Sequence, residues 1–152
     1  MRVLIQRIRQ GTVTSNGTEV GRVGTGLCLF LGISKDDTEA QADYLARKTV
    51  SLRIFEDETD KFNRSLLDIK GEVLIVSQFT LYGDCNKGRR PSFSRAAFSR
   101  EAERLYDYFV RRVQELGPRV ATGKFQAKME VAIINEGPAT FILDTDCKAS
   151  ES

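Results

Sequence analysis

The 152-residue chain contains no histidine. Histidine is both the commonest metal ligand and the commonest general acid or base near neutral pH. Any catalysis must therefore use hydroxyls, carboxylates, Lys or Arg side chains, backbone dipoles or groups that the substrate brings. The carboxylates show none of the spacings typical of metal sites, so we expect neither a bound metal nor a cofactor.

Cysteines and long apolar runs are also scarce. Cys28, Cys85 and Cys147 are odd in number and lack CxxC spacing, which argues against a disulfide framework or a zinc knuckle. No apolar run approaches the ~18 residues that a membrane-spanning helix needs, and the first residues do not resemble a signal peptide. We therefore expect a cytoplasmic protein with no membrane partner. The net charge of +2 excludes no class of enzyme.

What the chain does contain is typical of one folded domain. Hydrophobic residues make up 41% and charged residues 29% of the sequence. It has no internal repeat, linker or low-complexity segment. The sequence therefore predicts a single domain over residues 1–147, followed by a polar C-terminal tail over residues 148–152.

Strand signals recur along the chain. Asn16-Gly17 lies between β-prone segments and predicts a hairpin, because both residues tolerate positive φ. Two apolar runs, at residues 26–33 and 72–81, predict buried strands. Two last strands are predicted at about residues 129–134 and 139–143, and a surface loop at residues 56–64.

Two helices are predicted between these strands. The first begins where Asp36 and Glu39 are spaced as a capping box, and it runs to about Ser51. The second has apolar residues three and four positions apart up to Leu116 and ends at Gly117. The predicted fold is α+β, with a mostly antiparallel sheet curled into a barrel-like core and the two main helices packed outside.

The first candidate site is Ser77, Gln78, Phe79 and Thr80, at the end of an apolar strand. Strand alternation would place Ser77 and Phe79 on one face and the other two residues on the opposite face. Polar side chains at such a place need hydrogen-bond partners. Spacing alone favours a structural explanation, in which Gln78 and Thr80 bond to neighbouring loop backbone. Thr80 as a nucleophile lacks the adjacent base that a hydroxyl requires.

The second candidate is Gly137-Pro138, between the two last strands. Proline cannot donate a ladder hydrogen bond, so a plain turn is the simpler interpretation. The functional alternative is a fixed X-Pro bond that aims two carbonyls at a ligand. A third feature is the basic loop with Lys87, Arg89 and Arg90, which either solvates one face or contacts phosphates.

Taken together, these segments resemble the D-aminoacyl-tRNA deacylase family from Met1 to about Asp144. A single tetrapeptide would be a weak signal, but an ordered set of seven is specific. The segments are Leu4-Ile5-Gln6-Arg7, Arg53-Ile54-Phe55, Ser77-Gln78-Phe79-Thr80-Leu81, Lys87-Gly88-Arg89-Arg90-Pro91-Ser92-Phe93, Leu105-Tyr106-Asp107-Tyr108-Phe109, Thr122-Gly123-Lys124-Phe125 and Asn135-Glu136-Gly137-Pro138-Ala139-Thr140.

The resemblance implies a homodimer that hydrolyses the ester of D-aminoacyl-tRNA, and of glycyl-tRNA mischarged on tRNA(Ala), without a cofactor. It implies that Gly137-Pro138 is a cis pair that reaches into the partner subunit's pocket and excludes L-amino acids. Arg7 would hold that pair in place. Chemistry would rely on the ribose 2′-OH of the substrate, with an older proposal making Thr80 the nucleophile.

The resemblance also implies roles for the remaining pocket residues. Ser77, Gln78, Phe79 and Thr80 would line the ester end, where backbone N–H groups near Phe79 and Thr80 steady the oxyanion. The adenosine side of the pocket would consist of Phe125, Ala127 and Met129.

Three positions depart from the family's pattern. Glu136, Ala139 and Gln126 stand where the family commonly has Asp, Val and Gly. If position 139 is buried, the loss of two methyl groups is worth on the order of 1–2 kcal/mol. Two alternative functions stay open: a deacylase with a trans Gly-Pro pair that acts on an L-aminoacyl-tRNA, and a non-catalytic nucleic-acid-binding module.

Overall fold

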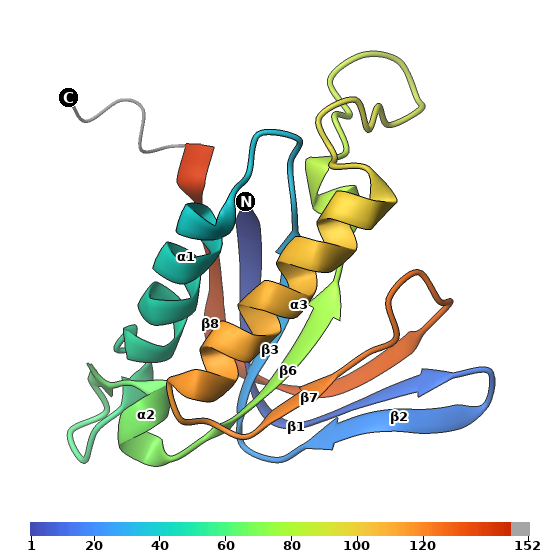
Figure 1. The fold of residues 1–152 in the computed structure, drawn as a ribbon. Coiled ribbons are helices and arrows are strands. Elements are labelled where there is room, and N and C mark those ends of the chain that lie inside the picture. Colours follow the sequence, from blue (N-terminus) through green and yellow to red (C-terminus); the bar gives the residue numbers. More distant parts are fainter. Residues whose placement is uncertain (147–152) are drawn as a thin grey trace, which may run out of the picture.

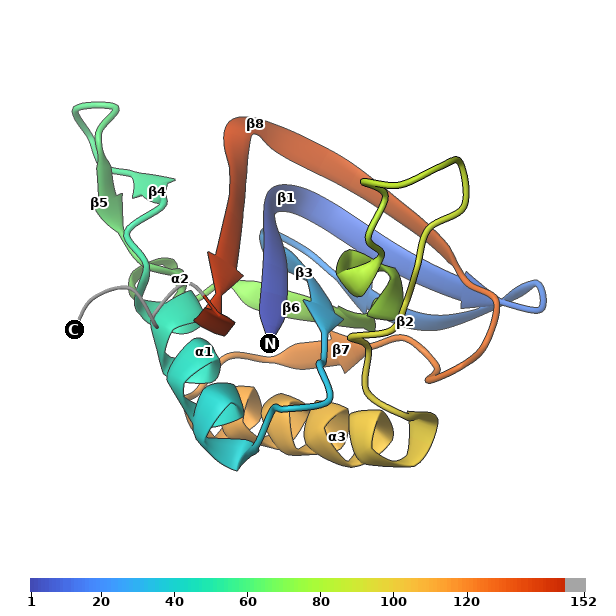
Figure 2. The same cartoon turned by 90° about the horizontal axis from the view of Figure 1, so that it is seen from above.

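Strand β1 (Arg2–Ser15) organises the fold of residues 1–146, the part of the chain that this computed structural model describes. It pairs antiparallel with three neighbours: β2 (Thr18–Val23), β3 (Gly26–Gly32) and β8 (Glu130–Asp144). Viewed from above, β1 and β8 bend together, and this bend curls the sheet toward a barrel (Figure 2). The predicted tail, residues 148–152, lies outside the described residues.

The other strand pairs of the main sheet are parallel. Strand β6 (Glu72–Ser77) pairs with β3 on one side and with β7 (Val120–Thr122) on the other. Parallel neighbours need a crossover connection, and each main helix lies in one. Helix α1 (Glu39–Ser51) lies between β3 and β6, and α3 (Ser99–Glu115) lies between β6 and β7.

The two main helices lie next to each other outside the curled sheet (Figures 1 and 2). The Asp43 carboxylate of α1 accepts hydrogen bonds from Tyr108 at 3.0 Å and from Arg112 at 2.7 Å, both on α3. The predicted α+β fold, a barrel-like sheet with two outer helices, is therefore confirmed. The two parallel pairs make the sheet mixed.

Four short elements complete the described chain: β4 (Phe55–Glu56), β5 (Phe62–Arg64), α2 (Leu66–Ile69) and the 3₁₀ turn η1 (Phe79–Tyr82). Strands β4 and β5 form a small antiparallel ribbon that projects from the body (Figure 2). The surface loop predicted at residues 56–64 is therefore in large part a two-stranded ribbon.

The predicted start of the first helix is wrong. The N-cap of α1 is Thr38, whose hydroxyl accepts from the Ala40 N–H, and Gln41 completes the capping box. Asp36 and Glu39 have the same three-residue spacing, but the chain enters the helix two residues later. Spacing alone does not distinguish the two possible boxes, because each has a capping residue and a partner three positions on.

The two strands predicted on either side of Gly137-Pro138 are one strand, β8. Its two halves both pair with β1, with Ile8 opposite Asn135 and Gln6 opposite Thr140. Residues 136–139 thus form a bulge opposite Arg7, which is where a strand tolerates proline. A plain turn at this place is therefore wrong.

The core lies between the sheet and the two helices. Large buried side chains from β1, α1 and α3, such as Ile5, Leu45 and Phe109, share one cluster. Cys28 is buried in a second cluster, and burial raises the pKa of its thiol to about 12. That thiol stays protonated and unreactive at neutral pH. Across residues 1–146, no helix is long and apolar enough to cross a membrane.

Candidate active site

The chain changes direction at the end of β6. The Gln78 N–H still donates to the Leu31 carbonyl of β3 at 2.8 Å, and the next residues wind into η1. Strand alternation therefore stops at Ser77, and the predicted two-face arrangement of residues 77–80 is wrong. Phe79 and Thr80 are instead the first residues of a 3₁₀ turn, whose leading N–H groups have no acceptor inside the turn.

A cavity of about 540 Å³ opens beside this turn. Its walls come from the ends of β3 and β6, the starts of η1 and α3, the loop between β7 and β8, and the start of β8. Its lining consists of Leu31, Ile33, Val76, Ser77, Gln78, Phe79, Ala97, Ser99, Ala102, Phe125, Gln126, Ala127, Met129 and Val131. Among the described residues, those that line the cavity include no ionisable side chain.

The cavity brings together six of the residues identified from the sequence: Ser77, Gln78, Phe79, Phe125, Ala127 and Met129. Thr80, Arg7, Gly137 and Pro138 are not among its lining residues. Sequence reasoning missed the wall at the start of α3, where Ala97 precedes the helix and Ser99 and Ala102 lie in it. Small residues at the start of a strongly periodic helix were the available signal, because small side chains leave room there.

The two polar side chains of the turn bond to each other. The Gln78 amide donates to the Thr80 hydroxyl, so this hydroxyl is an acceptor in the observed arrangement. The structural explanation named loop backbone as the partner, and the observed partner is a side chain. None of the interactions described for residues 1–146 places a basic group on the Thr80 hydroxyl.

The loop between β7 and β8 is closed on itself and packs against α3. The Lys124 N–H donates to the Met129 sulfur at 3.2 Å, which closes the loop on itself. The Phe125 ring packs on Tyr106 with centroids 5.8 Å apart. The Tyr106 hydroxyl in turn donates to the Ile75 carbonyl at 2.7 Å, and burial raises the pKa of this phenol.

Gln126, at the tip of this loop, has a positive φ of 62°. Glycine adopts that conformation without the clash that a Cβ introduces. This gives a physical reason for the family's glycine at the position, where the present chain has glutamine. Ala139, the second departure, is 3% exposed. Position 139 is therefore buried, which was the condition for a loss of packing energy relative to Val.

The bulge that contains Gly137-Pro138 is tied to Arg7. Arg7 is 2% exposed, and its Nε–H donates to the Glu136 carbonyl at 3.1 Å. Gly137 and Pro138 are themselves exposed, and the peptide bond between them is cis. Arg9, whose side chain is 71% exposed, has its Nε 3.4 Å from the Glu136 carboxylate.

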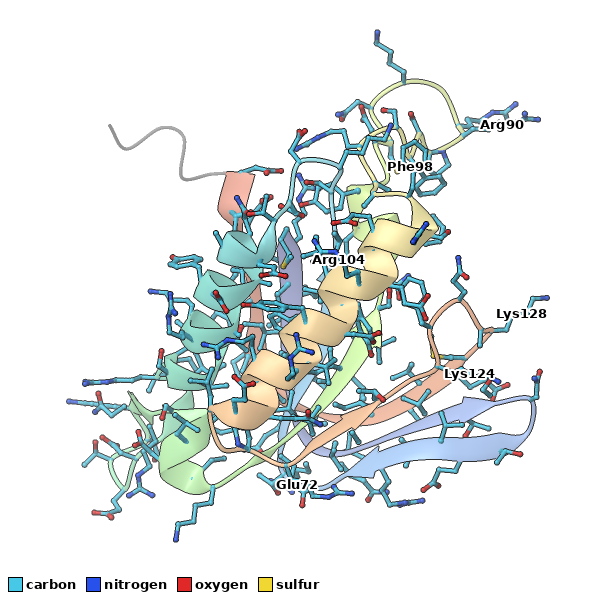
Figure 3. The ribbon with its side chains drawn as sticks, in the orientation of Figure 1. Glu72, Arg90, Phe98, Arg104, Lys124 and Lys128 are labelled. Atoms are coloured by element: carbon cyan, nitrogen blue, oxygen red, sulfur yellow. The ribbon has the colours of Figure 1, made fainter. Side chains whose placement is uncertain are left out.

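Exposed lysine and arginine side chains lie on two loops. Lys87, Arg89 and Arg90 are exposed on the loop between η1 and α3. Lys124 and Lys128 are exposed on the loop between β7 and β8, and Figure 3 shows Arg90 on the first loop and these two lysines on the second. The second pair was not identified from the sequence. Within residues 1–146, no cluster of carboxylates and cysteines could hold a metal ion.

Comparison with known proteins links this architecture to one family. The family model described as D-Tyr-tRNA(Tyr) deacylase matches residues 4–144. A D-aminoacyl-tRNA deacylase of Caldicellulosiruptor bescii is 54% identical over 145 residues, which are 95% of this chain and 97% of that protein. A protein of the same name from Bacillus cytotoxicus is 52% identical, over 95% of this chain and 99% of its own.

Two solved structures share this fold. The structure described as c-Myc DNA Unwinding Element Binding Protein superimposes with a TM-score of 0.90 at 38% identity, covering 95% of this chain and 99% of its own. A probable eukaryotic D-amino acid tRNA deacylase has the same fold, with a TM-score of 0.81 at 22% identity. The expectation of an enzyme of this class is confirmed, and the chain belongs to the D-Tyr-tRNA(Tyr) deacylase family.

Proposed function

We propose that this protein hydrolyses the ester between a D-amino acid and the 3′-terminal adenosine of tRNA, and that it rejects the L-ester. One observation carries the mechanism: the cavity described above is lined without any ionisable side chain. A general acid or base from this chain has no place in such a cavity. The remaining sources of catalysis are backbone dipoles and the substrate's own groups, of which the ribose 2′-OH lies next to the ester.

The ester is expected to lie against the start of η1. The first N–H groups of that turn, at Phe79 and Thr80, have no acceptor within it and can stabilise the oxyanion that forms on ester hydrolysis. Thr80 is a poor nucleophile, because its hydroxyl already accepts a hydrogen bond from Gln78 and has no base beside it. Ser77 and Gln78, just before this turn, also line the cavity.

The adenosine is expected to lie on the opposite wall, against Phe125, Ala127 and Met129. An aromatic ring and a thioether offer the polarisable, apolar contact that a nucleobase face prefers. Exposed Lys87, Arg89 and Arg90 would contact tRNA phosphates outside the cavity. Because aminoacyl-tRNA is made and used in the cytosol, we assign the protein to the cytoplasm.

Chiral discrimination requires a second copy of the chain. Gly137 and Pro138 are exposed and stand outside their own cavity, so a partner subunit would have to present them to it. In the homodimer we propose, their carbonyls occupy the space that an L side chain needs. Glycine has no side chain to exclude, so glycyl-tRNA mischarged on tRNA(Ala) is also a substrate.

The experiment is a paired deacylation assay on D-Tyr-tRNA, L-Tyr-tRNA and Gly-tRNA. We expect release from the D-ester and the glycyl ester, with the L-ester intact. Faster release from an L-ester would favour the alternative trans-type deacylase. Salt-sensitive tRNA binding with no release from several D-esters would favour the non-catalytic module. Replacing Lys87, Arg89 and Arg90 by Gln should weaken tRNA binding but leave kcat unchanged.

The adenosine wall offers a sharper mutational test, at Gly123. A Cβ on Gly123 would lie 2.5 Å from the Met129 sulfur, so Gly123→Ala must displace a residue that lines the cavity. Because Met129 is proposed to contact the nucleoside, we expect its displacement to remove about 1.4 kcal/mol of binding free energy, which corresponds to a tenfold rise in KM for D-Tyr-tRNA. Steady-state kinetics measure this rise. An unchanged KM would show that Met129 does not contact the nucleoside.

A further inference from the structure

The β4–β5 ribbon contacts the side chain of Arg7, which donates a hydrogen bond to the Gly137-Pro138 bulge. Arg7 donates from Nη1 to the Ile54 carbonyl at 2.9 Å, just before β4. Its Nη2 is 3.6 Å from the Glu56 carboxylate, and its guanidinium carbon stands 5.4 Å above the centre of the Phe62 ring. The ribbon is far from Gly137 in sequence, and none of its residues lines the cavity.

The geometry of the guanidinium makes these contacts matter for the bulge. Its donors lie in one rigid plane, so partners on Nη1 and Nη2 fix the direction in which Nε–H points. That N–H holds the Glu136 carbonyl at 3.1 Å, one residue before Gly137. The ribbon thus orients the guanidinium plane of Arg7, and this plane sets the position of the bulge backbone at Glu136.

The ribbon also supplies the nearer counter-charge for Arg7. A buried guanidinium needs a counter-charge close by. Glu56 is the nearer carboxylate at 3.6 Å, whereas the Glu136 carboxylate stands 4.0 Å away and also faces Arg9. Without Glu56, Arg7 would be drawn toward Glu136, and its Nε–H would turn from the carbonyl it holds.

The ribbon contacts the far side of the bulge as well. The Phe62 and Phe141 rings form a T-shaped pair with centroids 6.3 Å apart. Phe141 follows Pro138 by three residues in β8, while Glu136 precedes it by two. One aromatic side chain therefore contacts both the Arg7 plane and the strand on the other side of the bulge.

We propose that Glu56 and Phe62 are positioning residues of the chiral filter: acting through Arg7 and Phe141, they fix where the Gly137 and Pro138 carbonyls stand and so set the ratio of D- to L-ester hydrolysis. This inference rests on the proposed function. Neither residue lines the cavity, so both are expected to act on discrimination and to leave substrate binding by the cavity intact.

The test compares Glu56→Gln and Phe62→Leu with Glu58→Gln. Glu58 lies on the same ribbon and pairs with Arg64 at 2.9 Å, but its side chain is 89% exposed and it has no described contact with Arg7. The kcat/KM values for D-Tyr-tRNA and L-Tyr-tRNA are measured for each variant, together with Tm. Misplacement of a positioned group by about 1 Å can change reaction rates by about a hundredfold, and a displaced filter would exclude the L-ester less well.

We expect the D-to-L ratio of kcat/KM to fall about tenfold in Glu56→Gln and Phe62→Leu, and to stay at the wild-type value in Glu58→Gln. The KM for D-Tyr-tRNA should change little in all three. Glu56→Asp, which keeps the charge, should recover part of the ratio. An unchanged ratio in both positioning variants, with wild type active on the D-ester, overturns the inference alone. Wild type inactive on D-esters overturns the proposed function itself.

Discussion

Replacing Gly26 by alanine is expected to destabilise the fold by roughly 3 kcal/mol or more. Gly26 opens β3 and pairs with Glu72 at the start of β6, and its φ is 157°. A Cβ at this position would lie 1.8 Å from the Glu72 carbonyl oxygen and 2.7 Å from the Glu72 nitrogen. Both are backbone atoms, which cannot move aside as a side chain can, so the two strands would have to separate.

Thermal and urea denaturation of Gly26→Ala measure this loss, and a drop in Tm of about 6–12 °C corresponds to 3 kcal/mol in a domain of this size. The matched control is Gly24→Ala, two residues earlier in the connection between β2 and β3, where a Cβ meets no atom within 4 Å. We expect the control to unfold within about 0.5 kcal/mol of wild type. Equal stabilities for the two variants would show that β3 and β6 approach less closely than described.

Local sequence signals predicted the elements that are determined by residues a few positions apart. The period of apolar residues in α3 identified a helix whose observed end, Glu115, lies one residue from the predicted limit. The Asn16-Gly17 hairpin was predicted because both residues tolerate positive φ, and they have φ of 50° and 75°. Such features depend on neighbours within a few positions, which a sequence contains directly.

The features that were missed depend on distant partners. No local pattern states that β3 and β6 run parallel, because that follows from the path of α1 between them. The continuity of β8 was missed for the same reason: Pro138 interrupts the local strand signal, and only pairing with β1 on both sides carries the strand through.

The candidate site shows the same division. Spacing alone favoured structural explanations for residues 77–80 and Gly137-Pro138. The ordered set of family motifs is what indicated a functional role for both. Neither source indicated that residues 77–80 leave the strand, or that Ala97 and Ala102 form a cavity wall. The ribbon around Arg7 was equally hidden, since Glu56 and Phe62 meet Arg7 only through the fold.

Arg7→Lys is expected to impair chiral discrimination more than any ribbon variant. Lysine keeps the positive charge but presents it as a point, so it cannot hold the carbonyls of Glu136 and Ile54 in one plane as Arg7 does at 3.1 and 2.9 Å. One buried carbonyl loses its donor, which costs roughly 1–3 kcal/mol of stability. With the bulge displaced, the space that an L side chain needs is no longer blocked, and we expect the D-to-L ratio of kcat/KM, measured on D-Tyr-tRNA and L-Tyr-tRNA, to fall about a hundredfold.

Arg9→Lys is the control that distinguishes the planar hydrogen bonds of Arg7 from the effect of a positive charge near Glu136. Arg9 lies two residues along β1 and also faces Glu136, but its side chain is 71% exposed and makes one contact at 3.4 Å with the carboxylate. Exposed pairs of this kind contribute little, so Arg9→Lys should keep both its Tm and its D-to-L ratio. If Arg7→Lys matched Arg9→Lys in both measurements, charge alone would hold the bulge, and the planar contacts from Ile54 and Glu56 would have no part in the filter.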